Sequence, residues 1–159
     1  MTFLSHINEI SMRTILTLNH ASARRAIDAI YTEVDKRGRA ASISVADACG
    51  EPIVLLRMDG AKPPTHYIAT NQAATAAWEQ KRTMELGEWL RNRNIDVSFF
   101  GGRRFCGFGG GVPVIFENQS IGAVAFCGLT RLEDEEMANL GVTAALSTAE
   151  GPGATQSKV

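Results

Sequence analysis

The chain has 159 residues, of which 45% are hydrophobic and 21% are charged, so it is long enough for one globular domain with a sizeable core. Its net charge of −1 argues against a nucleic-acid partner, because phosphate binding needs concentrated basic charge. No run approaches the roughly 20 apolar residues of a membrane span, and the N-terminus lacks the basic and apolar regions of a signal peptide.

The cysteines Cys49, Cys106 and Cys127 are odd in number, widely spaced and without a C-x-x-C pair. This usage favours reduced thiols in the cytoplasm over a disulfide framework. The three histidines show no paired ligand spacing, so the sequence predicts no structural zinc site.

Residues 1–16 have no sustained periodicity and predict an N-terminal arm. Its apolar residues suit packing on a neighbouring subunit: Phe3, Leu4, Ile7, Ile10 and Ile15. Thr17 is a plausible N-cap for a helix that runs to about Arg37. His20, at the third helical position, falls on the apolar stripe of this helix, which consists of Ala23, Ile27, Ile30, Tyr31 and Val34.

Ser42–Asp47 and Pro52–Met58 read as two strands joined by a polar, glycine-containing turn, which predicts a first hairpin. Thr65, after two prolines, is a fair N-cap for a helix to about Lys81. The small-residue face of that helix would let it lie close on a sheet: Ala69, Ala73, Ala76 and Ala77. A short helix, Met84–Arg91, follows.

Val112–Phe116 and Ile121–Cys127 predict a second hairpin around the polar turn 117–120, and a short strand at Arg104–Phe108 could precede it. Pro113 restricts its strand to an edge or to its first residues. Glycines stand at both ends of the hairpin, as Gly109, Gly110 and Gly111 before it and Gly128 after it. They could jointly rim a pocket with exposed N–H donors, or they could simply permit tight packing of the backbone.

Thr130 and Glu133 form a capping box that opens a last helix to about Thr148. Residues 149–159 are rich in glycine, proline and polar residues and predict a disordered tail. The order of elements indicates a single α+β domain over residues 17–148, with an antiparallel sheet of about five strands flanked by helices.

An ordered series of short motifs resembles the GlcG/HbpS family over roughly residues 14–147: Val45-Ala46-Asp47-Ala48-Cys49-Gly50, Arg57-Met58-Asp59-Gly60-Ala61, Thr75-Ala76-Ala77, Gly110-Gly111-Val112-Pro113-Val114, Ile121-Gly122-Ala123-Val124, Gly128-Leu129-Thr130 and Asp134-Glu135. The resemblance implies a profilin-like α-β-α fold and homo-oligomers from dimers to octamers. Members of the family include haem-binding proteins, the C-terminal domain of PduO-type proteins and small proteins encoded near catabolic genes.

The chain departs from the family pattern at two places. Where the family commonly has a lysine in a D-K-A or E-K-A setting, this chain has Asn71-Gln72-Ala73, which removes a cation. The segment Phe99–Arg104, with the sequence FFGGRR, is also unusual. Both departures predict a changed chemistry of the pocket.

Two histidines and one aspartate are candidates for the chemistry of the site. The resemblance suggests His20 as a haem axial ligand, since the ligand histidine of haem-binding members lies in the first helix; the alternative is a hydrogen-bonded histidine at a core edge or subunit contact. His66, at the start of the second helix, could act as acid, base or ligand. Asp59 could move a proton, or it could only form the turn before Gly60.

The remaining candidates would line the predicted pocket. Met58 ends a strand there, and Arg103 and Arg104 could pair with a substrate carboxylate or with haem propionates. Cys127, just before the last helix, is either a thiol with a lowered pKa or a buried inert one. The candidate glycines are Gly109, Gly110, Gly111 and Gly128.

The leading hypothesis is a cytoplasmic oligomer that binds a small planar or anionic ligand, with haem as the most nameable cofactor. The alternative is an enzyme of small organic-acid or aromatic-ring catabolism, in which the glycine amides stabilise an oxyanion while His66 or Asp59 moves protons. A third hypothesis is an accessory protein that functions through its oligomer surface.

Overall fold

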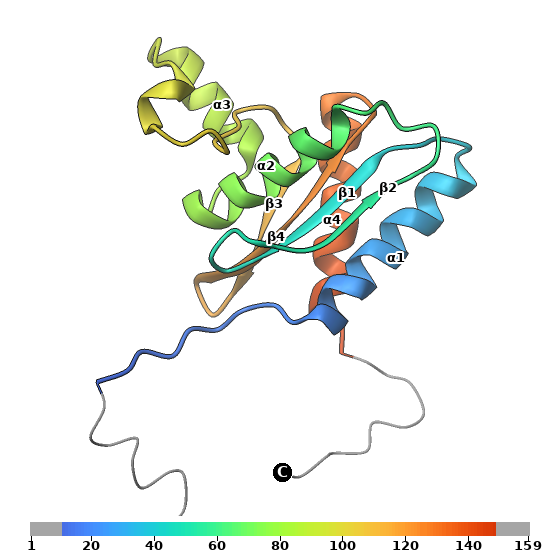
Figure 1. Ribbon diagram of the computed structural model, residues 1–159, viewed down its shortest axis with the longest axis horizontal. Coiled ribbons are helices and arrows are strands. Elements are labelled where there is room, and N and C mark those ends of the chain that lie inside the picture. Colours follow the sequence, from blue (N-terminus) through green and yellow to red (C-terminus); the bar gives the residue numbers. More distant parts are fainter. Residues whose placement is uncertain (1–10, 149–159) are drawn as a thin grey trace, which may run out of the picture.

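The computed structural model describes residues 11–148, so the predicted tail and the first ten residues of the predicted arm lie outside the described residues. It shows an antiparallel sheet between helices, which confirms the α+β class (Figure 1). In chain order the elements are α1 (His20–Lys36), β1 (Ser42–Asp47), β2 (Pro52–Arg57), α2 (Thr65–Glu79), α3 (Thr83–Asn92), the 3-10 turn η3 (Val97–Phe100), β3 (Gly111–Phe116), β4 (Gln119–Cys127) and α4 (Arg131–Leu146). None of the helices in this part of the chain is long and apolar enough to cross a membrane.

The sheet has the strand order β2-β1-β4-β3, with antiparallel neighbours throughout. Ser42 pairs with Arg57 on one side and with Cys127 on the other, while Gly111 pairs with Ala125. The end of β2, the end of β4 and the start of β3 therefore meet at one end of the sheet, as the sequence predicted. The sheet has four strands instead of about five, because residues 104–108, where a short strand was predicted, form none.

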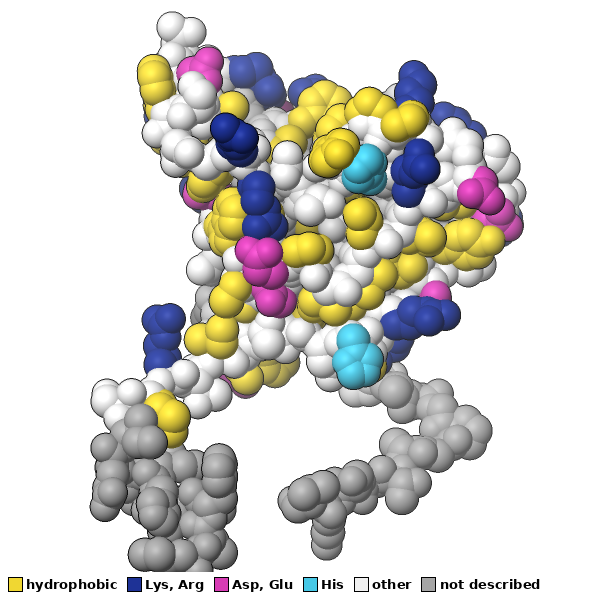
Figure 2. Space-filling model, in the orientation of Figure 1, with side chains coloured by type: hydrophobic (Ala, Val, Ile, Leu, Met, Phe, Trp, Pro, Cys, Tyr) yellow, Lys and Arg dark blue, Asp and Glu magenta, His cyan; other side chains and the backbone are white. Residues whose placement is uncertain are grey.

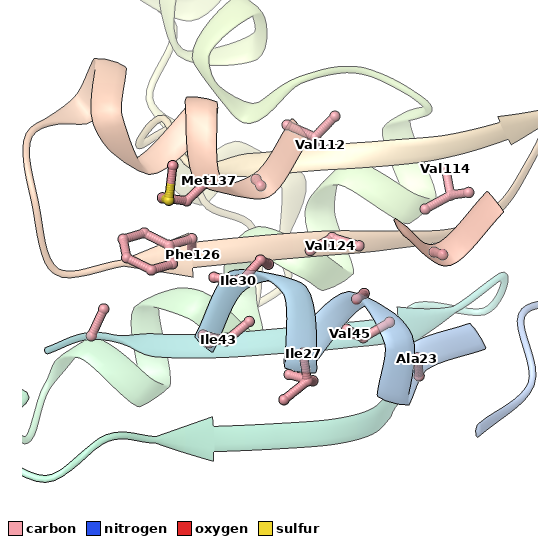
Figure 3. Packing of buried hydrophobic residues seen from close by; sticks show 14 of the residues in the cluster. Ala23, Ile27, Ile30, Ile43, Val45, Val112, Val114, Val124, Phe126 and Met137 are labelled. Carbon is pink, nitrogen blue, oxygen red and sulfur yellow. The ribbon is translucent and has the colours of Figure 1, made fainter. Parts of the chain in front are cut away.

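Two helices cover one face of the sheet and α2 covers the other (Figure 1). The large apolar side chains of β1 and β4 face α1 and α4, where Ile43, Phe126 and Met137 are fully buried (Figure 3). The α2 face is built from small residues, among them Ala73 against Ala125. Small side chains on both surfaces let α2 lie close to the sheet, as its alanine face predicted.

Two predicted element boundaries are corrected by the structure. The turn of the second hairpin consists of Glu117 and Asn118 alone, both at positive φ, 48° and 63°, as a two-residue turn of the I′ type requires. The first helix is capped by the side chain of Asn19. Thr17 instead accepts a hydrogen bond from the Ala48 N–H at 2.9 Å, so His20 is the first helical residue and not the third.

The outer edge of β3 is closed to further pairing. Phe126 N–H donates to Gly110 O. Because the N–H and C=O groups of successive residues along a strand point to opposite sides, those of Gly111 and Pro113 point away from β4. Thr83 Oγ1 takes the Gly111 N–H at 2.9 Å, and Pro113 has no N–H. The prediction that Pro113 marks an edge strand is confirmed.

The outer edge of β2 is left open by the described part of the chain. Met58 N–H donates to Ala41 O, so by the same alternation the backbone groups of Leu55 and Arg57 point away from β1. Among residues 11–148, no backbone group forms a hydrogen bond with these outward-facing groups of Leu55 and Arg57. The hollows described next lie along this edge.

Candidate functional site

A hollow of about 610 Å³ lies between β2 and the start of α2, lined by Leu55, Arg57, Pro63 and His66. Leu55 and Arg57 project from the same face of β2 because side chains alternate along a strand. Figure 2 shows hydrophobic side chains gathered over the face of the molecule that carries α2 and β2. The hollow therefore combines an apolar wall with one cation and one imidazole.

Contacts to the sheet fix the start of α2, and with it His66. The Thr65 hydroxyl donates to Lys62 O at 2.6 Å and lies 2.8 Å from the Ser42 hydroxyl, which belongs to the first residue of β1. Both Ser42 and Thr65 are buried. The first turn of α2 is thus held at the end of the sheet where β2 finishes.

His66 is held in one tautomer by its own helix start. Its Nδ1 lies within hydrogen-bond distance of Pro63 O, and a carbonyl oxygen only accepts, so Nδ1 carries the proton. In the neutral ring the Nε2 lone pair is then available to a metal ion. The Tyr67 ring lies 3.9 Å from the imidazole, centroid to centroid, and is 68% exposed, so it adds apolar surface beside His66.

A second, smaller hollow of about 290 Å³ lies on the α1 side of the β2 end. Asp59 and the buried Met58 belong to this hollow, with Tyr31 and Arg39 on its other side. Asp59 and His66, the two predicted proton carriers, therefore line adjacent hollows and not one pocket. Arg57 lines both hollows.

Arg57 is the site residue that sequence reasoning missed. It is exposed and makes no ion pair within 4.0 Å among the described residues, so its guanidinium is available to a ligand. Alternation along β2 was the available signal, because it puts the last residue of the strand on the same face as Leu55.

The predicted rim of glycines is instead a region of close packing. A Cβ added at Gly109, Gly110 or Gly111 would meet other parts of the chain at 2.9, 2.5 and 2.5 Å. Gly111 donates its N–H to Thr83, and Gln72 Nε2 donates to Gly109 O at 2.8 Å. Gln72, which stands at the family's lysine position, therefore ties α2 to this turn.

Gly128 differs because it is exposed, although a Cβ added there would still lie 2.7 Å from Ala41 Cβ. At Gly109, Gly110 and Gly111, which are buried, the structure favours the alternative of tight backbone packing. Both ends of the hairpin do lie at the predicted end of the sheet, but side chains and neighbouring backbone fill the space between them.

Arg104 lies at the far end of the sheet, away from both hollows. Its guanidinium pairs with Glu51 at 2.7 Å and lies over the Trp78 ring, 5.1 Å from the centroid. Glu51 follows the β1–β2 turn, which is opposite to the end where Arg57 lies. Arg104 thus links this turn to the segment before β3, and its neighbour Arg103 is exposed.

His20 also lies at that far end of the sheet. It is exposed, and Leu18 just before it donates its N–H to Ile121 O. The structure therefore does not bring His20 and His66 together.

Burial raises the pKa of the Cys127 thiol to about 12, and the nearby Asp134 carboxylate adds to the shift. The pKa of Cys106 is also raised by burial. Cys127 is therefore protonated at neutral pH, and the alternative of a buried inert thiol holds. Asp134 is itself buried and accepts from the Leu129 N–H at 2.8 Å, which fixes the loop between β4 and α4.

Comparison with known proteins places this arrangement in a family. Residues 18–143 match the family model described as haem degrading protein HbpS-like. Protein GlcG of Escherichia coli (strain K12) is 35% identical over 113 residues, which cover 71% of this chain and 83% of GlcG.

Two solved structures are similar to this fold. Klebsiella pneumoniae protein ORFY has a TM-score of 0.78 at 27% identity, covering 86% of this chain and 95% of that chain. A double mutant of Streptomyces reticuli HbpS has a TM-score of 0.76 at 27% identity, covering 88% of this chain and 92% of its own. The family match and the GlcG relationship confirm the resemblance seen in the motifs, and the chain belongs to the HbpS-like family.

Proposed function

We propose that this protein binds a small planar, anionic ligand, with haem as the best candidate, in the hollow between β2 and α2. The observation that carries the proposal is the position of His66, whose Nδ1 faces Pro63 O so that Nε2 is the ring nitrogen left for a ligand, beside a hollow of about 610 Å³. A volume of this size falls in the range of roughly 300–1,000 Å³ typical of small-molecule sites. The haem degrading description of the family supports the choice of ligand.

The residues present fit the parts of such a ligand. Nε2 of His66 would hold the iron, and the guanidinium of Arg57 would pair with a propionate. Leu55 and Tyr67, both exposed, would cover part of the macrocycle. Iron supplies the redox chemistry of a bound haem, while these side chains bind and orient it.

We also propose that the protein is a homo-oligomer and that it works in the cytoplasm. The exposed Tyr31 and Leu55 beside the open edge of β2 favour association with another subunit. The free thiols of Cys49, Cys106 and Cys127 favour a reducing compartment.

Titration with hemin tests the ligand proposal. We expect the wild-type protein to give a sharp Soret band, and His66→Ala to lose the coordinated spectrum. His20→Ala is the matched control, because His20 is exposed at the other end of the sheet. A spectrum unchanged in His66→Ala would overturn the assignment, and loss in His20→Ala alone would move the site to α1.

The enzyme hypothesis has less support from the geometry. Of the glycine amides that would stabilise an oxyanion, the Gly111 N–H is already bonded to Thr83. Either His66 or Asp59 could move the proton, but the two line adjacent hollows, so they do not form an acid–base pair. Ligand binding is therefore the function that we retain.

A further inference from the structure

An aromatic patch, formed by Trp78, Phe99, Phe100 and Phe105, lies near the end of α2. Phe105 stacks on Phe100 with ring centroids 4.8 Å apart and lies 5.3 Å from the Trp78 ring. Phe99, beside Phe100 in η3, is 79% exposed. Figure 2 shows hydrophobic side chains among Lys and Arg on the part that projects around α3. Two members of the patch, Phe99 and Phe100, belong to the unusual segment that departs from the family pattern.

A second apolar surface lies in residues 11–16, the described part of the predicted N-terminal arm. In its described part the side chains of Met12, Ile15 and Leu16 are all exposed. Its sequence continues this apolar character toward the N-terminus with Phe3, Leu4, Ile7 and Ile10. The arm also lies outside the family match, which begins at residue 18.

The root of the arm and the aromatic patch are fixed to the same turn of the fold. Thr17 binds the Ala48 N–H at 2.9 Å in the turn between β1 and β2. The next residue of that turn, Cys49, accepts from the Trp78 indole N–H at 2.6 Å. The arm thus leaves the domain close to the patch, but its described part runs past the β3–β4 turn and away from α3 (Figure 1).

We propose that the N-terminal arm of one copy covers the aromatic patch of a second copy. In a two-fold symmetric dimer, each arm would pack on the patch of the other subunit, so that both arms and both patches would be buried. Two aliphatic or aromatic surfaces that face solvent in one chain are both buried by this single contact. The proposal does not depend on the ligand or on the hollow of His66.

Two full-length variants test the contact, with oligomer mass measured by light scattering. Phe99→Asp changes the patch, and Ile15→Asp with Leu16→Asp changes the arm. All three side chains are exposed, so the domain should remain folded, as circular dichroism would verify. We expect both variants to form smaller particles than the wild type. The matched control is Leu132→Asp on α4, which is 74% exposed and should leave the mass unchanged.

Fluorescence of Trp78, in a Trp89→Phe background, reports on the patch itself. We expect emission at longer wavelength in the arm variant, and recovery when a peptide of residues 2–17 is added. A peptide of the same composition in scrambled order should have no effect. A wild-type monomer would place the arm on its own chain and overturn the proposal. A full-sized Phe99→Asp particle, or no response to the peptide, would also overturn it.

Discussion

Asp134 joins the loop after β4 to α4 through one carboxyl oxygen, while the other oxygen is buried without a hydrogen-bond partner in the described chain. Burial raises the pKa of this carboxyl from 3.8 to about 6, against the opposing effect of the Leu129 and Gly128 N–H groups. The folded state therefore favours the protonated form. The stability gained from protonation is fully present below about pH 4 and is lost as the pH rises through about 6.

Unfolding in urea at about pH 4.5 and about pH 7.5 tests this coupling. Between these values the wild type should lose about 2 kcal/mol more free energy of unfolding than Asp134→Asn, because one pKa unit corresponds to about 1.4 kcal/mol and the lower pH lies about 1.5 units below the folded pKa of about 6. Glu133→Gln is the matched control. Hydrogen bonds from Thr130 lower the pKa of Glu133, so this carboxylate stabilises the folded state as the pH rises, the opposite of Asp134. An equal pH dependence in Asp134→Asn and wild type would contradict the account.

At the level of secondary-structure elements, Thr83 connects α3 to the outer edge of β3. Its hydroxyl is buried and accepts the Gly111 N–H at 2.9 Å. Thr83→Val keeps the shape of the side chain but leaves that N–H without an acceptor, which should destabilise the protein by about 1–3 kcal/mol in urea unfolding. Thr83→Ser keeps the acceptor and should lose less. A valine variant as stable as the wild type would refute this role.

Local sequence signals predicted the elements well where the chain itself supplies the partner. The capping box of Thr130 and Glu133 is present in the structure, and both hairpins form where the β-branched runs indicated. The first helix start was missed because the hydroxyl of Thr17 binds Ala48, which is 31 residues away. No local pattern contains such a contact.

For the whole molecule, the sequence predicted which strand ends converge but not what fills the space between them. Glycine is required at these positions because Gln72, Thr83 and Phe126 lie too close to the backbone for a Cβ atom. This closeness depends on how the helices pack on the sheet. Arg104 was assigned to the pocket by its nearness in sequence to the glycines. Its partner Glu51 lies at the other end of the sheet. Alternation along β2 was a signal for Arg57, but only the strand order shows that β2 is an edge strand.

The division into two hollows predicts different effects of two neighbouring substitutions. Arg57→Gln should weaken hemin binding by about tenfold to a hundredfold, because a hydrogen bond to a charged group contributes roughly 1.5–3 kcal/mol. Asp59→Asn should leave the affinity unchanged, because Asp59 lines the hollow on the α1 side. Both affinities can be measured by fluorescence quenching. Equal weakening by the two substitutions would show that the hollows act as one site.

The central claim is that Nε2 of His66 is the ligand atom of the site. Nitrogen-15 NMR of the protein labelled at histidine tests it directly, before and after hemin is added. We predict that free His66 is the Nδ1–H tautomer and that bound ferric iron shifts or broadens its resonances while those of His20 persist. Unchanged His66 resonances in the presence of bound hemin would contradict the claim.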